Sequence, residues 1–345
     1  MDVKTLLALA QNAVDVGNIK AAQEFYEVAL TRTPNSIDVL EAYAELMIHY
    51  MQDIPRAKQM LRHAIEVDPQ RGYVKYLNLA QLCDADESLD CYQRAIQIVH
   101  VELQSCRKKR KREGLKETLS TVYCAIAELY LTDLCYNPDA EQRCEEAVTH
   151  ALKFNAESVE AHQLQASLRL SQCRPDEALQ SLRCAVNLTH RLSEAHQPTY
   201  ESKVELARLL MQVSPDDAYR FLLEVLQYGD NNPYIWFLLG ESARMRKRYV
   251  DAARLLRRAR VMLTISDGDA GALQEVDAAI ALLVDEMGGP AAVEHIPNLD
   301  HPNPIELLQP EDDEEDDCND TNEDGNANLD LEEPEWESCD DEDDD

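Results

Sequence analysis

The chain has 345 residues, of which 66 are acidic and 33 basic, so its formal net charge is −33. Residues 311–345 contain 21 Asp and Glu and no Lys or Arg, which leaves a net charge of −12 on residues 1–310. Because phosphate contacts need clustered positive charge, direct binding to nucleic acid or to an anionic membrane is not expected. The length favours either two domains or an elongated repeat array over one compact core.

Neither a transmembrane segment nor a secretory signal is expected. No stretch approaches the roughly 18 consecutive apolar residues of a membrane span, and the N-terminus has no apolar run followed by a cleavage site. The ten cysteines are scattered without a CxxC pair, which favours a reducing compartment. We therefore expect the protein in the cytoplasm and the nucleus.

Apolar residues recur at the spacing of amphipathic helices, in a repeat of about 34 residues. The clearest unit begins near Asn232 and predicts two helices, marked by Trp236, Leu239, Gly240 and Ala243 and then by Tyr249, Ala252, Leu256 and Ala259. Small Gly240 would let the second helix approach closely. This spacing is typical of the tetratricopeptide repeat (TPR), a helix–turn–helix unit.

Two N-terminal units follow the same pattern, and each ends at a proline that stops a helix. Those prolines, Pro34 and Pro69, are 35 residues apart, which predicts one inserted residue in the turn of the second unit. Four weaker units fill the middle of the chain. One of them contains a predicted long helix from about Leu115 to Cys135. A last helix, spanning residues 273–283, would cap the stack, since each unit buries its apolar face only against its neighbours.

The predicted fold is therefore all-α. It is a TPR solenoid of about seven helical hairpins plus a capping helix over residues 1–287, interrupted by a basic insertion near 104–114. Five prolines and two adjacent glycines make residues 288–310 a Pro-rich, non-helical strap or linker. The acidic tail, residues 311–345, cannot bury enough apolar surface to fold and is expected to be disordered.

Catalytic motifs are missing from the sequence. The nine histidines form no HExxH, and no GxSxG, GxxxxGK[ST] or GxGxxG occurs. We therefore expect no enzyme, no cofactor, no metal site and no catalytic residue.

In stacked units of this type the first helix of each hairpin lines a groove, and residues between its core positions face a ligand. This rule predicts a client-binding surface of carboxylates interleaved with aromatic rings: Asp38, Glu41, Glu45, Glu128, Glu201, Glu205, Tyr234, Phe237 and Glu241. Such a surface suits an extended segment rich in Arg and Lys, through charge-assisted hydrogen bonds and cation–π contacts. An ordinary solvated helix face is the alternative.

A basic hexamer lies between the third and fourth units. It consists of Arg107, Lys108, Lys109, Arg110, Lys111 and Arg112. Short basic runs act as nuclear-import signals or bind polyanions. An import signal and a contact with the acidic tail are favoured over nucleic-acid binding, and an ordinary solvated segment stays open.

Several stretches resemble the family of assembly chaperones of ribosomal protein L-four. They are the N-terminal DVKTLLALAQNAVDVGNIKAAQEFYEVAL, the short-turn unit YLNLAQLCDADESLDCYQRAI, the unit NNPYIWFLLGESA and the acidic tail. The resemblance covers about residues 1–287, while RKKRKR has no counterpart that we can place. It implies a dedicated chaperone that binds the basic, extended loop of a newly made large-subunit ribosomal protein in its groove. It also implies escort of that client to nuclear pre-ribosomes, with import factors and the pre-ribosome met through the client.

Two other binding functions are alternatives to a chaperone of a basic client. A TPR scaffold subunit of a larger non-ribosomal complex would hold an apolar helix, and salt should then matter little. Binding of acidic chaperone C-termini requires a Lys/Asn clamp on the first three inner helices. That clamp is absent. Lys4 is followed four residues later by Ala8 instead of Asn, and Lys75 is followed by Leu79 where a second basic residue would be needed.

Overall fold

The computed structural model describes residues 1–193, 196–227, 232–265 and 270–299. These residues form sixteen α-helices and no β-strand. None of the described helices is both long and apolar enough to cross a membrane. The predicted acidic tail, and the predicted linker beyond residue 299, lie outside the described residues.

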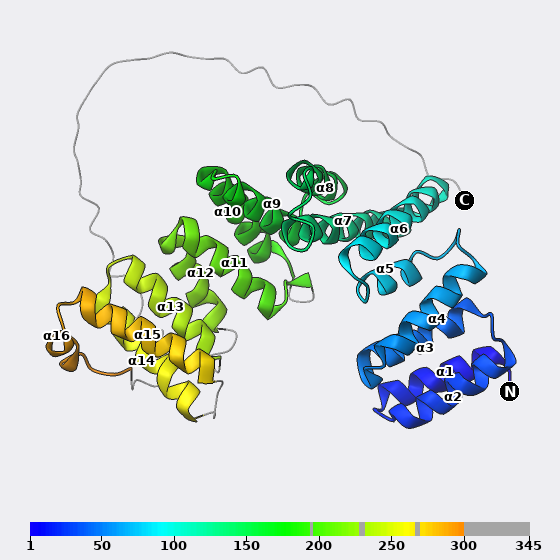
Figure 1. Ribbon diagram of the computed structural model, residues 1–345, viewed down its shortest axis with the longest axis horizontal. Helices are drawn as coiled ribbons and strands as arrows, with labels where there is room; N and C mark the ends of the chain where they lie inside the picture. Colours follow the sequence, from blue (N-terminus) through cyan, green and yellow to red (C-terminus); the bar gives the residue numbers. More distant parts are fainter. Residues whose placement is uncertain (194–195, 228–231, 266–269, 300–345) are drawn as a thin grey trace, which may run out of the picture. The chain divides into compact units, whose positions relative to one another are not determined.

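Successive helices pack in pairs along the chain, which confirms the predicted TPR solenoid of seven hairpins (Figure 1). The pairs are α1 (Val3–Asp15) with α2 (Ile19–Arg32), α3 (Ile37–Leu46) with α4 (Ile54–Val67), α5 (Val74–Ala80) with α6 (Ala85–Ser105), α7 (Lys109–Leu131) with α8 (Ala140–Phe154), α9 (Val159–Ser171) with α10 (Pro175–Arg191), α11 (Tyr200–Val213) with α12 (Pro215–Gln227), and α13 (Pro233–Met245) with α14 (Tyr249–Ile265).

The turns of the hairpins are specified locally. Gly17 has φ +75°, a left-handed conformation that glycine adopts without strain. The next residue, Asn18, accepts a hydrogen bond from the Ala21 amide and so caps the first turn of α2. Asp53 and Asp84 cap α4 and α6 in the same way. Short polar residues therefore set where the second helices begin.

The predicted insertion in the second unit is taken up by a π-helical turn. Residues Met47–Met51 continue α3 as η1 with the wider π-type hydrogen bonding, and the turn ends at Gln52 with φ +55°. A π turn accommodates one extra residue without breaking the helix. The buried positions Tyr43, Ala44 and Met47 thereby keep their place in the core.

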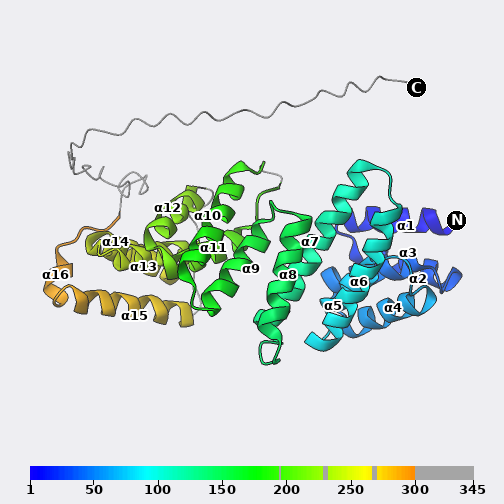
Figure 2. The same cartoon turned by 90° about the horizontal axis from the view of Figure 1, so that it is seen from above.

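The seventh hairpin packs as its sequence predicts. Trp236 is fully buried, and a β-carbon added to Gly240 would lie only 2.7 Å from Leu256 Cγ. Since real β-carbons do not approach other atoms so closely, the glycine is what lets α13 and α14 touch. The capping helix is α15 (Ala270–Glu286), which packs on both α14 and α13 (Figure 2).

Two local predictions differ from the structure. Helix α7 begins at Lys109 and ends at Leu131, so four of the six basic residues are helical, and the predicted end near Cys135 is wrong. Residues 288–299 are not wholly extended, because Pro290–Glu294 form the short helix α16. Its Val293 and the later Leu299 are buried. Proline at the first position of a helix is compatible with helical geometry, which explains the difference.

Candidate functional site

The three predicted carboxylates of the second unit lie on one face of α3. Asp38, Glu41 and Glu45 are spaced by three and four residues, the spacing of neighbours on a helix. Asp38 and Glu45 are exposed and Glu41 is half-buried. Burial raises the pKa of Glu41, the charge of Lys75 opposes that shift, and the charges of Asp38 and Glu45 add to it. The three residues therefore form one electrostatic group, named here the α3 carboxylate face.

No ion pair neutralises this face within the described residues, although the charge of Lys75 acts on Glu41. The Oε1 atom of Glu41 is buried without a hydrogen-bond partner, and no ion pair is formed by Asp38, Glu41 or Glu45 within the described part of the chain. Glu45 only accepts a hydrogen bond from the Asn78 side chain, at 3.4 Å. Unpaired carboxylates on one face attract Arg and Lys side chains of a ligand.

Lys75 lies close to this face but cannot serve an incoming anion. Its side chain is fully buried, and Nζ donates hydrogen bonds to the carbonyl oxygens of Asp68 (2.5 Å) and Arg71 (2.6 Å). The ammonium group thus fixes the connection between α4 and α5. Its burial agrees with the absence of a carboxylate clamp in the sequence.

A second acidic group lies where α7 meets α9. The predicted Glu128 is exposed on α7, and its charge reaches Glu160 on α9. The surrounding protein desolvates Glu160 and raises its pKa, and the charge of Glu128 raises it further, although the side chain keeps contact with solvent. The sequence analysis did not identify Glu160, because its proximity to Glu128 arises from the packing of α7 against α9.

The predicted residues of units six and seven have mixed environments. Tyr234 and Phe237 stack with ring centroids 5.9 Å apart, and Tyr234 is exposed. Glu201 is exposed, while Glu205 pairs with Arg208 at 3.2 Å. An exposed pair of this kind is weak, so Glu205 can exchange its partner for a ligand.

Glu241 is a poor candidate for ligand binding. Its carboxylate accepts two hydrogen bonds from Arg244, at 2.8 and 3.1 Å, and Arg244 also binds Glu286 of the capping helix at 2.8 Å. Both partners of the first pair are mostly buried. Glu241 therefore orients Arg244, and Arg244 joins α13 to α15 through Glu286, a contact that a rule based on helix positions alone does not detect.

The nine predicted residues thus form separate clusters. In the described residues no hydrogen bond, ion pair or ring contact joins the α3 carboxylate face, the pair Glu128 and Glu160, and the group on α11 and α13 to one another. A ligand that contacts all three has to extend along several hairpins. That geometry suits an extended peptide segment better than a compact small molecule.

The basic hexamer divides into two parts with different environments. Residues Arg107 to Lys111 are exposed, and Lys111 makes a long ion pair with Glu102, at 3.8 Å. Arg112 instead donates hydrogen bonds to the carbonyl oxygens of Leu103 and Cys106, both at 3.0 Å. These carbonyls end α6, so Arg112 has a structural function there.

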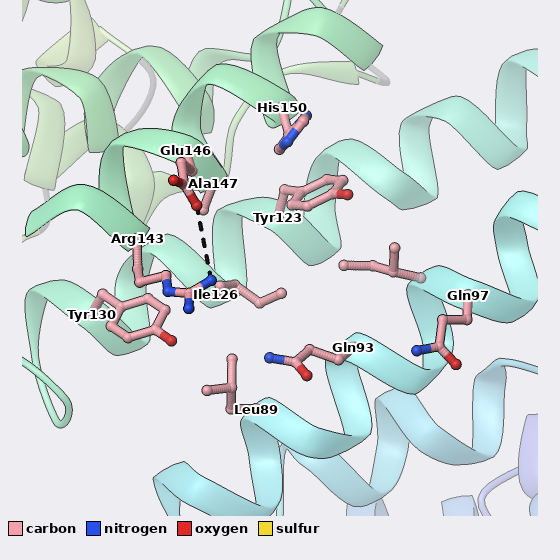
Figure 3. Close-up of a pocket in the computed structure, with 11 residues that line it drawn as sticks. Leu89, Gln93, Gln97, Tyr123, Ile126, Tyr130, Arg143, Glu146, Ala147 and His150 are labelled. Carbon is pink, nitrogen blue, oxygen red and sulfur yellow. Dashed lines mark ion pairs between the residues drawn. The ribbon is translucent and has the colours of Figure 1, made fainter. Parts of the chain in front are cut away.

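A hollow with a partly apolar lining lies elsewhere, between α6, α7 and α8 (Figure 3). Its volume is about 290 Å³, and Leu89, Ile96, Tyr123 and Ile126 supply much of its apolar lining. Arg143 lies at its edge, where it is paired with Asp139 at 3.0 Å and with Glu146 at 4.0 Å. The hollow contains none of the nine predicted residues, and its edge cation is already neutralised. Among the described residues no cluster of His, Cys, Asp and Glu is arranged to hold a metal ion.

Hairpin pairing and repeat length define a TPR solenoid. No protein-family model matches the sequence. A crystal structure of a TPR protein from Parabacteroides merdae superposes with a TM-score of 0.50 at 15% identity, over 81% of this chain and 98% of that one. At this identity the match supports the fold alone.

More specific similarities fall on one group of proteins. The chain is 35% identical to the probable assembly chaperone of rpl4 of Schizosaccharomyces pombe over 224 residues, 62% of this chain and 63% of that protein. It is 27% identical to the protein of the same name in Emericella nidulans over 258 residues, 69% of this chain and 64% of that protein. The chain thus spans less than two thirds of either relative.

A solved structure of the assembly chaperone of RpL4 (Acl4, residues 1–338) matches with a TM-score of 0.65 and 25% identity. The match covers 72% of this chain and 98% of that one. Together with the two relatives, it confirms the resemblance that the sequence motifs indicated.

Proposed function

We propose that this chain is a dedicated chaperone for a newly made large-subunit ribosomal protein of the RpL4 type. It binds the basic, extended loop of that client along the first helices of its hairpins and keeps the client soluble. The function is binding without catalysis. Partners beyond the client, namely the pre-ribosome and import factors, are met through the client.

One observation in the structure supports this proposal most strongly. The α3 carboxylate face presents three acidic side chains on one helix face, and none of them forms an ion pair among the described residues. Two relatives of this chain are named as probable assembly chaperones of rpl4. A ribosomal protein loop is rich in Arg and Lys because it contacts RNA, and phosphate contacts dominate such binding.

The physical mechanism is electrostatic masking. Free basic loops bind stray RNA, whereas carboxylates spread over several hairpins satisfy the same guanidinium and ammonium groups. Each exposed contact is weak, about 0–1 kcal/mol, so affinity comes from many contacts along an extended segment. Ribosomal RNA, with its denser charge, can then displace the chaperone at assembly.

A native affinity purification at low salt tests this function. We expect one basic ribosomal protein to be recovered in stoichiometric amount, and a parallel high-salt wash to remove much of it. The Debye length falls from about 10 Å at 0.1 M to about 3 Å at 1 M salt, which weakens exposed charge pairs. A salt-resistant set of non-ribosomal subunits would instead support a scaffold and overturn the proposal.

Residence in both cytoplasm and nucleus is part of the proposal. The exposed residues Arg107 to Lys111 are proposed as the import signal. A reporter fused to residues 104–114 should accumulate in the nucleus, and Lys108→Ala with Lys109→Ala should abolish this. If the full-length double variant still enters the nucleus with its client, import depends on the client.

A further inference from the structure

Helix α14 gathers positive charge in an otherwise acidic chain. Four of the seven residues from 254 to 260 are arginines. Three of them, Arg254, Arg257 and Arg258, line a cavity of about 60 Å³ together with Val261, Asn298 and Leu299. The cavity therefore lies between α14 and the segment that follows α16, and its charged lining is entirely basic.

The charges of Arg257 and Arg254 are not fully neutralised. Arg257 donates to the carbonyl oxygens of Val293 and Ile296, both at 2.7 Å. Carbonyl groups are neutral, so the guanidinium charge remains. The carboxylate paired with Arg254 is Asp251, at 3.9 Å, and Arg248 binds that carboxylate more closely, at 2.6 Å.

Arg258 has no anionic partner at all among the described residues. Its Nε atom is buried and makes no hydrogen bond. Its guanidinium lies 5.8 Å from the centre of the ring of Trp236, which is itself fully buried. Buried donors are almost always satisfied in proteins, and the partly exposed guanidinium of Arg258 is free to pair with an oxyanion. An anion in the cavity would pair with Arg258 and satisfy this unmet interaction.

We propose that this cavity binds a phosphate group, either free or carried by a phosphorylated side chain. Arginine donates in a planar fork that matches the oxygens of an oxyanion. Arg258 and Arg254 supply the charged donors, the Asn298 amide supplies a neutral one, and Arg257 fixes the wall opposite α14. The site is distinct from the α3 carboxylate face and goes beyond the proposed chaperone function.

Titration of inorganic phosphate into the full chain, followed by calorimetry and by phosphorus NMR, tests the site. Chloride is used to hold ionic strength constant. We expect saturable binding to the wild type, and we expect Arg258→Gln to weaken it by about tenfold or more, as loss of a charge-assisted contact implies. Arg260→Gln is the matched control, because Arg260 lies on the same helix but pairs with Asp277 at 2.6 Å and does not line the cavity.

A rise in the stability of the protein on adding phosphate would not by itself demonstrate the site, since phosphate salts stabilise many proteins by exclusion from their surface. Absence of saturable binding to the wild type, or equal binding by both variants, would overturn the proposal. If Arg258→Gln fails to fold, Arg254→Gln serves as the second variant and should also weaken binding. A phosphoserine peptide that binds more tightly than inorganic phosphate and than its unphosphorylated form would identify a phosphorylated partner as the source. Equal affinity of peptide and inorganic phosphate would identify free phosphate.

Discussion

Glu41 on α3 and Lys75 on α5 carry opposite charges that attract each other, yet they form no ion pair. Lys75 Nζ donates its hydrogen bonds to two backbone carbonyl oxygens. Gly72 lies beside both side chains, because a β-carbon there would be 3.7 Å from Glu41 Oε1 and 3.7 Å from Lys75 Nζ. The Oε1 atom of Glu41 is therefore left buried and without a hydrogen bond. The negative charge of Glu41 adds to the attraction of the α3 carboxylate face for a basic ligand, at the expense of the stability of the free protein.

This relationship predicts that Glu41→Gln stabilises the ligand-free protein at neutral pH. Burial, the largest cause, raises the pKa of Glu41 in the folded state. The carboxyl group therefore favours folding at acidic pH, and that contribution is lost as the pH rises through the folded-state pKa. Urea unfolding at pH 7 and pH 4 checks this: the variant should be more stable at pH 7, and the difference should shrink at pH 4. A variant less stable at pH 7 would show that the attraction to Lys75 outweighs burial.

Gly240→Ala should destabilise the seventh hairpin by about 1–3 kcal/mol, since the added methyl group overlaps Leu256. Thermal or urea unfolding measures the change. The control is Gly114→Ala in α7, where a β-carbon meets nothing within 4 Å. That substitution should stabilise by roughly 0.5–1 kcal/mol, the usual gain from replacing glycine within a helix. Equal effects at the two positions would contradict the close packing of α13 on α14.

Residues within the basic hexamer should differ in their effect on stability. Arg112→Ala removes the donors to the Leu103 and Cys106 carbonyls and should cost about 1–2 kcal/mol. Lys109→Ala removes an exposed side chain and should change stability by less than about 0.5 kcal/mol. Chemical unfolding compares the two. If both are neutral, Arg112 does not hold the end of α6.

Much of the fold was predictable because its determinants are local and periodic. The small residue at 240, the prolines at 34 and 69 and the inserted residue of unit two all have direct structural counterparts in the described helices. The short helix α16 was not predicted, since a proline-rich composition indicates a linker while the burial of Val293 and Leu299 depends on α14, far away in the sequence.

The site was predictable only in part. Helix spacing placed the α3 carboxylates together, but ion pairing is decided by neighbours from other helices. The pair of Glu241 with Arg244, three residues later on the same helix, is an exception that spacing could have revealed, whereas the contact of Arg244 with Glu286 of α15 depends on tertiary packing. Glu160 was missed because its proximity to Glu128 arises from the packing of α7 against α9, which no local pattern reveals.

The most direct test of the account is calorimetric titration of the basic loop of the proposed RpL4-type client into three forms of the full chain. The first is wild type, the second Asp38→Lys with Glu45→Lys, and the third Glu24→Lys with Glu66→Lys, a control of equal charge change at exposed glutamates of α2 and α4. Glu41 is left intact because a lysine there would face the buried Lys75. We predict binding that weakens with salt, a loss of at least about tenfold in the second form and little change in the third. Equal losses in both variants, or affinity indifferent to salt and to Asp38 and Glu45, would contradict recognition by the α3 carboxylate face.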